Sequence, residues 1–244
     1  MQKELPLLAF FGHHKCASTW IHRILSEYGR HAGLEHAYLY DAQQFNGDLP
    51  AYVGQTGTDL ISYVNAEAGH IAGLPPFRAF HVVRDPRDLL VSAYFSHLHS
   101  HPTKAWPELI GHRERLKSVS KTEGLILEVE FLDFAFNAIR GWDYDRPEVL
   151  ELRQEDLTRA PYDGFLQIFN WLGVLDPDEF DRSARLSHWR DVARNLAAER
   201  LPGLGALHDP IQLFPAERLL GIVYENRFDK LAGGRKAGKE DVQS

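Results

Sequence analysis

The stretch GHHKCASTW, residues 12–20, combines residue types that can hold an anion. Lys15 supplies a positive charge, and the hydroxyls of Ser18 and Thr19 supply hydrogen-bond donors. An apolar run precedes the stretch and a helical pattern follows it, so these side chains should lie at the beginning of a helix. Helix N-termini have unpaired N–H groups and a dipole that favours negative charge, so the stretch predicts a site for an anionic ligand.

The same residues also have ordinary structural explanations. Ser18 and Thr19 could simply cap the helix, and Lys15 could lie on a solvated surface. Trp20 offers a flat face that could stack on a base, or it could belong to the core. Their occurrence together on one strand–loop–helix unit favours the anion site.

The loop differs from the phosphate-binding loop of nucleotide triphosphatases. That motif, G-x-x-x-x-G-K-[ST], ends with a hydroxyl residue that binds magnesium. Here Gly12 and Lys15 have the wrong spacing, and Cys16 stands where the hydroxyl residue would be. The sequence shows no clear set of carboxylates for a metal ion, so we expect no metal cofactor.

A second group of polar residues follows a later apolar run. Arg84 stands at the end of RAFHVVR, and Ser92 follows about two helical turns further on. A guanidinium matches the geometry of a phosphate, and a serine can add one hydrogen bond. The alternative is that Arg84 pairs with Asp88 or another carboxylate and that Ser92 is an ordinary helix residue.

Short apolar runs alternate with longer helical patterns, which is typical of a parallel sheet with crossover helices. We expect an α/β fold in a single domain, with a central parallel sheet of about five strands flanked by helices. The expected strands are Leu7–Phe11, His36–Tyr40, Leu60–Asn65, Arg78–Val83 and Glu148–Arg153.

The helices that follow have recognisable ends. A first helix should end at Gly29, since glycine is common at helix C-termini. Asp85 and Pro86 resemble an N-cap followed by a first-turn proline. An apolar stripe near residues 165–172 predicts a late helix that ends at Gly173.

The composition limits the partners and the compartment. The 244 residues carry a net charge of −7, which gives no general attraction for nucleic acid or an anionic membrane surface. Cys16 is the one cysteine, so an intrachain disulfide cannot form, and a reducing, cytoplasmic location fits. No apolar run is long enough to predict a transmembrane helix, and the N-terminal LPLLAFF predicts a buried strand.

Three segments together resemble a known family. HHKCASTW resembles the K-x-G-T-T-W loop of sulfotransferases that use 3′-phosphoadenosine 5′-phosphosulfate (PAPS). VVRDPRDLLVSAYFSH is similar to their R-[DN]-P-[RK]-D-x-x-x-S segment, with the same spacing of eight from Arg84 to Ser92. VLELRQEDL resembles their strand ending in YEDL, with Gln154 in place of tyrosine.

The resemblance implies a P-loop-NTPase-like sulfotransferase fold and a role for each matching residue. Lys15 would contact the phosphosulfate and steady the leaving oxygen, and Ser18 and Thr19 would hold the 5′-phosphate. Arg84 and Ser92 would bind the 3′-phosphate.

Four further loop residues complete the implied cofactor-binding set: His14, Cys16, Ala17 and Trp20. Trp20 would lie near the adenine. Ala17 stands where glycine is common, so the loop must accept a Cβ atom. We expect Cys16 to be a packed thiol without a catalytic role.

The resemblance also implies a base that takes the proton from the acceptor hydroxyl. In carbohydrate and protein-tyrosine sulfotransferases a glutamate lies on the second strand, roughly twenty residues past the basic residue of the loop. Glu35 and His36 both lie at about that distance from Lys15, and we expect this pair to be catalytic. Cytosolic sulfotransferases use a histidine after the third strand, and His70 could fill that part.

The segment SHLHSHP places three histidines two residues apart, at His97, His99 and His101. Alternate residues of a helix do not converge on one point, so we expect no zinc site there.

Many relatives continue past a GGR-x-x-G segment into a basic, glycine-rich loop that also grips the 3′-phosphate. This sequence has Gly233, Gly234, Arg235 and Gly238, and ends at Ser244. We expect a sulfotransferase domain at residues 1–232 and a polar, mobile tail at 233–244, with the terminal loop missing or replaced by another segment.

The leading hypothesis is a sulfotransferase that moves the sulfuryl group of PAPS to a hydroxyl of a small molecule, a lipid or a carbohydrate, leaving 3′,5′-adenosine bisphosphate (PAP). One alternative is a nucleotide-dependent kinase on the same scaffold. Another is a non-catalytic nucleotide-binding protein. The sequence does not distinguish the acceptors or the oligomeric state.

Overall fold

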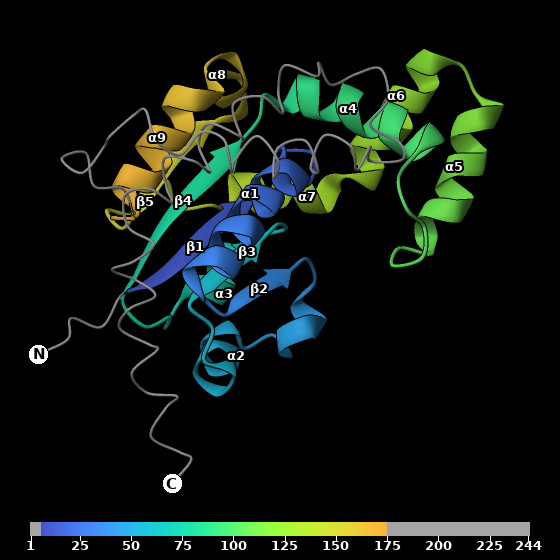
Figure 1. The fold of residues 1–244 in the computed structure, drawn as a ribbon. Helices are drawn as coiled ribbons and strands as arrows, with labels where there is room; N and C mark the ends of the chain where they lie inside the picture. The colour runs from blue at the N-terminus through green and yellow to red at the C-terminus, as the bar shows by residue number, and fades with distance from the viewer. Residues whose placement is uncertain (1–5, 175–244) are drawn as a thin grey trace, which may run out of the picture.

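A five-stranded sheet forms the centre of the protein in the computed structural model, which describes residues 6–174 (Figure 1). Its strand order is β2-β3-β1-β4-β5, and every neighbouring pair is parallel. The strands are β1 Leu7–Gly12, β2 His36–Leu39, β3 Leu60–Tyr63, β4 Phe77–Val83 and β5 Val149–Arg153. The predicted α/β class with a parallel sheet is confirmed, and each predicted strand exists within one or two residues of its expected bounds.

Helices connect the strands, as parallel strands require. They are α1 Ser18–Ala32, η1 Ala42–Phe45, α2 Leu49–Thr56, α3 Ala68–Ile71, α4 Pro86–His99, α5 Glu108–Ser118, α6 Lys121–Phe131, α7 Asp133–Arg140, α8 Gln154–Arg159 and α9 Pro161–Trp171. Figure 1 shows α4, α5 and α6 grouped to one side of the sheet, away from α2 and α9.

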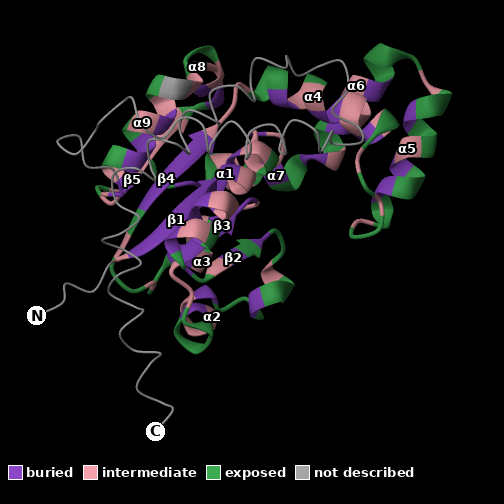
Figure 2. Ribbon diagram, viewed as in Figure 1, coloured by how far each residue is buried: buried purple, intermediate pink, exposed green. Residues whose placement is uncertain are grey.

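Strand β1 is buried on both faces because its apolar residues alternate between two cores. Phe10 belongs to a core with residues of α1 and α9, whereas Phe11 belongs to a core with η1 and α2. A strand that is buried on both sides reads as a continuous apolar run, and LLAFF is such a run. Figure 2 shows this burial along the middle of the sheet.

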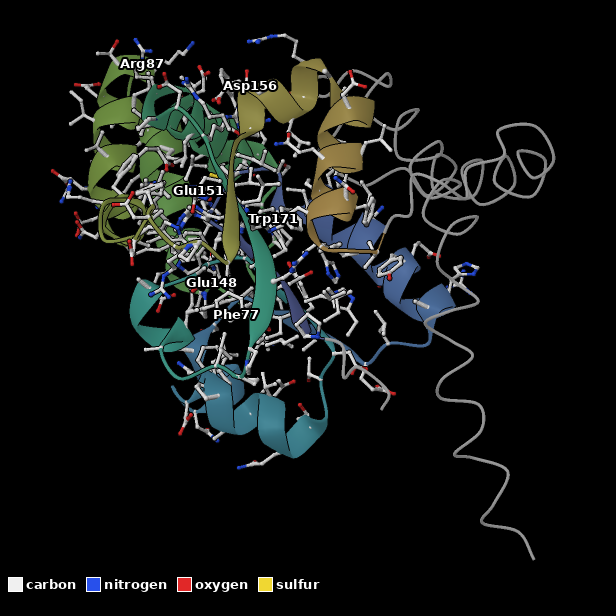
Figure 3. All side chains as sticks on the ribbon, turned by 90° about the vertical axis from the view of Figure 1, so that its left-hand side faces the viewer. Phe77, Arg87, Glu148, Glu151, Asp156 and Trp171 are labelled. Atoms are coloured by element: carbon white, nitrogen blue, oxygen red, sulfur yellow. The ribbon has the colours of Figure 1, made fainter. Side chains whose placement is uncertain are left out.

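Helix α9 is fixed to β4 by hydrogen bonds between distant parts of the chain. The Trp171 Nε1–H donates to the Ala79 carbonyl at 2.8 Å, and Arg78 Nη1 donates to the Trp171 carbonyl at 2.9 Å. Figure 3 shows Trp171 beside β4 and Phe77 at the beginning of that strand, while Arg87 lies on α4, beyond the other end of the strand. Arg87 marks the end at which the strands lead into the loops of the candidate site.

Three predicted helix ends were tested by the structure. The late helix, α9, ends at Trp171, and Gly173 follows with a left-handed φ of 72°, in agreement with the prediction. Helix α1 does not stop at Gly29 but continues to Ala32, and Gly33 provides the left-handed C-cap, whose N–H donates to the Gly29 carbonyl. Helix α4 begins as predicted, because the Asp85 carboxylate accepts from the Arg87 N–H and Pro86 is the first helical residue.

Several predictions fall outside the described residues: the end of the 1–232 domain, the 233–244 tail and the segment Gly233–Gly238. Within residues 6–174, none of the helices combines the length and the apolar character that crossing a bilayer needs.

Candidate functional site

The loop between β1 and α1 combines left-handed residues with the start of a helix. Lys15 and Ala17 both adopt left-handed conformations, with φ of 62° and 60°. Ala17 is the N-cap of α1 and provides no side-chain acceptor for the first helical N–H groups. These N–H groups are therefore not occupied by a capping side chain, and they are directed toward the loop.

Lys15 and Arg84 meet at this loop, although 69 residues separate them in the sequence. Arg84 Nη1 donates to the Lys15 carbonyl at 3.1 Å. Burial, together with the charge of Arg84, lowers the pKa of Lys15 to about 8, while Glu128 acts in the opposite direction. Two cations held this close in a partly buried place are favourable when an anion lies between them.

Arg84 does not make the carboxylate pair that was the alternative for it. The ion pairs among residues 6–174 do not include Arg84, and Asp88 is exposed. The Nε atom of Arg84 is buried and has no hydrogen-bond partner within the described part of the chain. An unpaired N–H of a buried guanidinium is costly, and an anionic ligand would satisfy it.

Helix α4 packs against the loop through Cys16. The side chains of Leu89 and Ala93 form a small core with Cys16, and Ser92, next to them on the helix, is half-buried. Burial raises the pKa of the Cys16 thiol to about 12, and the thiol is packed as expected, while its lack of a catalytic role stays a prediction.

The remaining loop residues separate into solvent-facing and core-facing positions. Thr19 is exposed and Ser18 is half-buried at the start of α1. Trp20 packs against the first core and meets Phe165 of α9 edge-on, with ring centroids 5.1 Å apart. The structure therefore favours the core explanation for Trp20 over stacking on a base.

Glu35 and His36 are not brought to Lys15. They lie at the beginning of β2, where His36 aligns with Leu60, and Leu60 aligns with Leu8 at the beginning of β1. The loop follows β1 four residues later, a distance of about 13 Å along a strand. The sequence spacing suggested proximity, but about twenty residues lead through α1 back to the far end of the sheet.

The side chains of this pair and of His70 have other contacts. His36 Nε2 lies 2.9 Å from the Ser62 hydroxyl, and burial lowers its pKa to about 4. Glu35 is exposed. His70 Nδ1 lies 2.8 Å from the Tyr63 hydroxyl, at the end of β3 that lies nearer to the loop.

A buried chain of side chains extends from His14 into the helices. His14 Nε2 lies 3.0 Å from His97 Nε2, and His97 Nδ1 lies 2.9 Å from a Glu128 carboxylate oxygen. The other Glu128 oxygen lies 2.8 Å from His112 Nε2. With Glu128 ionised, His97 must donate from Nδ1, so its Nε2 accepts from His14 Nε2–H. We call His14, His97, His101, His112 and Glu128 the helix-side cluster.

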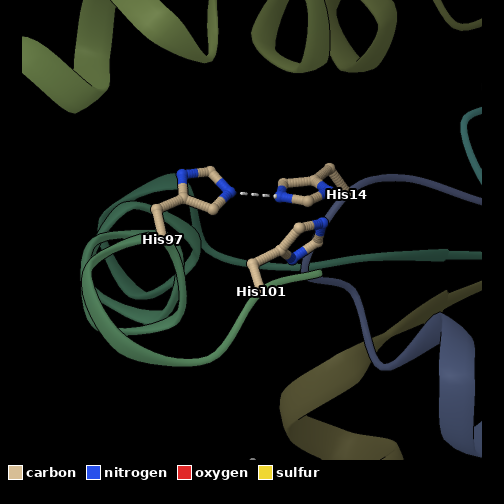
Figure 4. Close-up of side chains that lie close together, drawn as sticks. All are labelled: His14, His97 and His101. Atoms are coloured by element: carbon tan, nitrogen blue, oxygen red, sulfur yellow. Dashed lines mark hydrogen bonds between the residues drawn. The ribbon is translucent and has the colours of Figure 1, made fainter. Parts of the chain in front are cut away.

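His101 joins this cluster beyond the end of α4 (Figure 4). Its ring centroid lies 5.2 Å from those of both His14 and His97. The prediction that the histidines of SHLHSHP do not converge is wrong for His97 and His101, which are four residues apart and meet on one side. His99 is exposed and points elsewhere.

A second buried chain extends from His13 into the sheet. His13 Nε2 lies 2.8 Å from His81 Nε2, and His81 Nδ1 lies 2.6 Å from Glu151. Trp142 donates from Nε1 to the other Glu151 oxygen at 2.9 Å and stacks on the His81 ring. We call His13, His81, Trp142 and Glu151 the strand-side cluster, and Figure 3 shows Glu151 on the edge strand.

Most members of the two clusters, among them His81, Glu128 and Glu151, were not predicted from the sequence. The available signal was the histidine pair directly after a buried strand, at residues 13 and 14. Their partners lie 68 and 83 residues away, on β4 and α4. No local spacing connects residues at such separations.

Comparison with solved structures gives a match, whereas comparison with family models and with curated proteins gives none. No family model matches the chain. No curated protein matches it either. Among solved structures, the chain is similar to the mouse sulfotransferase SULT7A1 complexed with PAP, with 13% sequence identity and a TM-score of 0.49 over 97% of this chain and 88% of that one.

Proposed function

We propose that this protein is a sulfotransferase that uses PAPS and an acceptor hydroxyl of a small molecule, a lipid or a carbohydrate. The observation that supports this most is the meeting of Lys15 and Arg84 at an uncapped helix N-terminus. PAPS would supply an activated sulfuryl group and two phosphate groups at separate positions. Two cations and a row of backbone N–H groups suit such a ligand better than a single phosphate.

The residues of this chain that fit the cofactor have distinct tasks. The N–H groups at the start of α1, with Ser18 and Thr19, would hold the 5′-phosphate. Lys15 would stabilise the charge that develops on the leaving oxygen, because a cation in a partly buried site acts strongly on nearby charge. Arg84, whose Nε lacks a partner in residues 6–174, would bind the 3′-phosphate with Ser92.

The helix-side cluster offers a base other than the predicted Glu35, His36 and His70. Burial lowers the pKa of His14, His97 and His101, and the nearby positive charge of Lys15 adds to this effect. We assign proton removal from the acceptor to His14, with His97 and Glu128 as positioning residues. Glu35 and His36 stay a prediction from the resemblance, which the geometry does not support.

Cys16 bears on both the cellular location and the choice between a sulfotransferase and a kinase. The single cysteine, Cys16, is buried and reduced, which fits a cytoplasmic protein. The kinase alternative is disfavoured because Cys16 occupies the position of the magnesium-binding hydroxyl residue.

Calorimetric titration with PAP, and separately with ATP plus magnesium, tests the proposal. We expect PAP to bind and ATP to bind more weakly, since we assign Arg84 to a 3′-phosphate that ATP lacks. Arg84→Ala should weaken PAP binding at least about 10-fold, the effect of losing a hydrogen bond to a charged group. Arg87→Ala is the matched control, because Arg87 is exposed and pairs only with Asp85 among the described residues.

Preference for ATP would contradict the sulfotransferase proposal. PAP binding without sulfate transfer to a panel of phenols, sugars and lipid hydroxyls would instead support the non-catalytic alternative. Equal losses in Arg84→Ala and Arg87→Ala would show that Arg84 has no specific role.

A further inference from the structure

We propose that His14, His97 and His101 form a binding site for a divalent transition-metal ion, with zinc as the best fit. Each of the three imidazoles offers one nitrogen, and these three atoms all lie within 4.8 Å of one another. Figure 4 shows the three rings side by side: His14 comes from the loop, His97 from α4, and His101 from the chain just beyond that helix. Imidazole nitrogens suit zinc, cobalt, nickel and copper, whereas magnesium and calcium prefer oxygen ligands.

The nitrogen separations are close to those of a tetrahedral site. Zinc–nitrogen bonds of about 2.0–2.1 Å place two ligand nitrogens about 3.3 Å apart. His14 Nε2 and His97 Nε2 are 3.0 Å apart, so a few tenths of an ångström would suffice. The larger adjustment falls on His101, which is half-buried, lies past the helix end and makes no side-chain hydrogen bond to the described residues.

Neighbouring residues hold two of the ligands in the required orientation. His97 Nδ1 is bonded to Glu128, which leaves Nε2 as the ligand atom and reproduces the carboxylate–histidine–metal arrangement of zinc sites. Arg113 donates to the backbone carbonyls of His97 and His101, at 2.5 and 2.6 Å, and so fixes the backbone that carries both rings.

A second set of ligand atoms, from His97, His112 and Glu128, is less suitable. These groups already satisfy one another by hydrogen bonds, and His112 stacks on Phe131 with ring centroids 3.8 Å apart. We therefore expect Glu128 and His112 to hold His97 in place, and we do not expect this second set to bind the metal ion itself.

The charged groups near the site act on a cation in opposite directions. Lys15 and Arg113 repel a metal ion, while the Glu128 carboxylate, which is fully buried, attracts it. Three protein ligands leave a fourth position for water or an acceptor hydroxyl, as in catalytic zinc sites. A bound ion would also replace the hydrogen bond between His14 and His97, so the metal-loaded protein and the metal-free relay are two distinct states.

The binding itself is independent of the proposed sulfuryl transfer, so it is tested on the protein alone. Untagged full-length protein is freed of metal with a chelator, titrated with zinc chloride, desalted and analysed for zinc by mass spectrometry. We expect about one more zinc per chain in the wild type than in His101→Ala, and an affinity loss of at least about 100-fold in that variant. His99→Ala is the matched control, because His99 is exposed and lies between the two ligands in sequence.

Cobalt supplies a second readout, since Co²⁺ in a site with few ligands absorbs visible light more strongly than hydrated Co²⁺. We expect this absorption in the wild type and in His99→Ala, and its loss in His101→Ala. Equal zinc content in the wild type and His101→Ala, or an equal loss in His99→Ala, would overturn the proposal. PAP titration of the same samples separates this failure from a failure of the proposed function, and urea unfolding shows that each variant is folded.

Discussion

The two clusters on either side of the loop are built from the same parts but differ in access. His13 leads to His81 and Glu151, and His14 leads to His97 and Glu128. Each cluster is a carboxylate, a histidine and a second histidine in series. The two loop residues are adjacent in the sequence, yet their side chains leave in opposite directions.

The strand-side cluster is enclosed by the sheet. His13 is 1% exposed and His81 is 0% exposed, and Trp142 covers the His81 ring. His13 Nδ1 is buried and has no partner in residues 6–174. The two rings are closed to solvent while Glu151 is half-buried, so we assign His13 and His81 the role of fixing the loop to β4 and β5.

The helix-side cluster is attached to separate helices and lies beside Lys15. It ends in His101, which is half-buried. The two clusters contain the same residue types but differ in burial and in neighbouring charge. These two properties decide whether such a cluster only stabilises the fold or can also exchange protons or bind a ligand.

The largest effect should come from Lys15, which lies beside the helix-side cluster only. Lys15→Met keeps the length of the side chain and removes its charge. We expect conversion of PAPS to PAP, with water or an added phenol as acceptor, to fall by about 1,000-fold. The free energy of unfolding should not decrease, because burial already disfavours this charge, and urea unfolding is the control.

Full turnover in Lys15→Met, or a loss explained by unfolding, would contradict this role for Lys15. Either result would also remove the reason for assigning proton removal to the helix-side cluster, which is its position beside Lys15.

The strand-side cluster should show its largest effect in stability. His81→Ala removes the ring between His13 and Glu151 and leaves a buried carboxylate with one partner fewer. We expect urea unfolding to show a loss of about 3 kcal/mol. The matched change on the helix side, His101→Ala, should cost less than about 1 kcal/mol, since that ring is half-buried.

Similar losses in His81→Ala and His101→Ala would mean that the two clusters do not differ as proposed. The strand-side and helix-side clusters would then differ only in their place in the fold and not in their contribution to stability.

His14 should affect turnover more than folding. Glutamine at this position can still donate a hydrogen bond to His97 but cannot take up a proton at neutral pH. We expect His14→Gln to lower the rate of PAPS conversion by about 100-fold, within the range for loss of a general base. PAP affinity, measured by calorimetry, should change less than about 3-fold, and a matching loss of affinity would point to a binding role instead.

The sequence was a good guide to the sheet and to the loop, for physical reasons. LLAFF is apolar throughout because β1 is buried on both faces, so the strand was visible as a run. Lys15 and Arg84 each follow a strand, and the carboxyl ends of parallel strands share one edge. The closeness of Lys15 and Arg84 was therefore predictable from the order of strands and helices.

The remainder of the site depended on contacts that no spacing encodes. Glu35 and His36 were predicted to lie near Lys15 from their distance in the sequence. They lie instead at the beginning of β2, whereas the loop lies at the end of the sheet where the parallel strands finish. The convergence of His97 and His101 with His14 depends on how α4 packs on Cys16, which is a tertiary contact.

Both clusters should make stability depend on pH in the same direction. Burial lowers the pKa of His13 and of His97 to about 3 from the ordinary value of 6.5. The unfolded chain therefore takes up protons first as the pH falls below about 6.5, so stability decreases with falling pH and the loss continues toward pH 3. We expect urea unfolding at pH 5 to give a free energy on the order of 2 kcal/mol lower than at pH 7 for each such histidine.

His13→Gln and His14→Gln should each make this pH dependence shallower. Stability that rises as the pH falls from 7 to 5 would contradict the neutral state of both clusters.

The smallest effect concerns the turn that separates the two clusters. Ala17 holds a left-handed conformation at φ 60°, which is costly for a residue with a Cβ atom. Ala17→Gly should remove that cost, and the greater freedom of glycine in the unfolded chain offsets part of the gain, which leaves about 0.5 kcal/mol of added stability. Ala93→Gly, inside helix α4, is the control and should lower stability by about 1 kcal/mol or more. Equal losses in both variants would show that the turn is not strained, and the opposite directions of His13 and His14 would then need another cause.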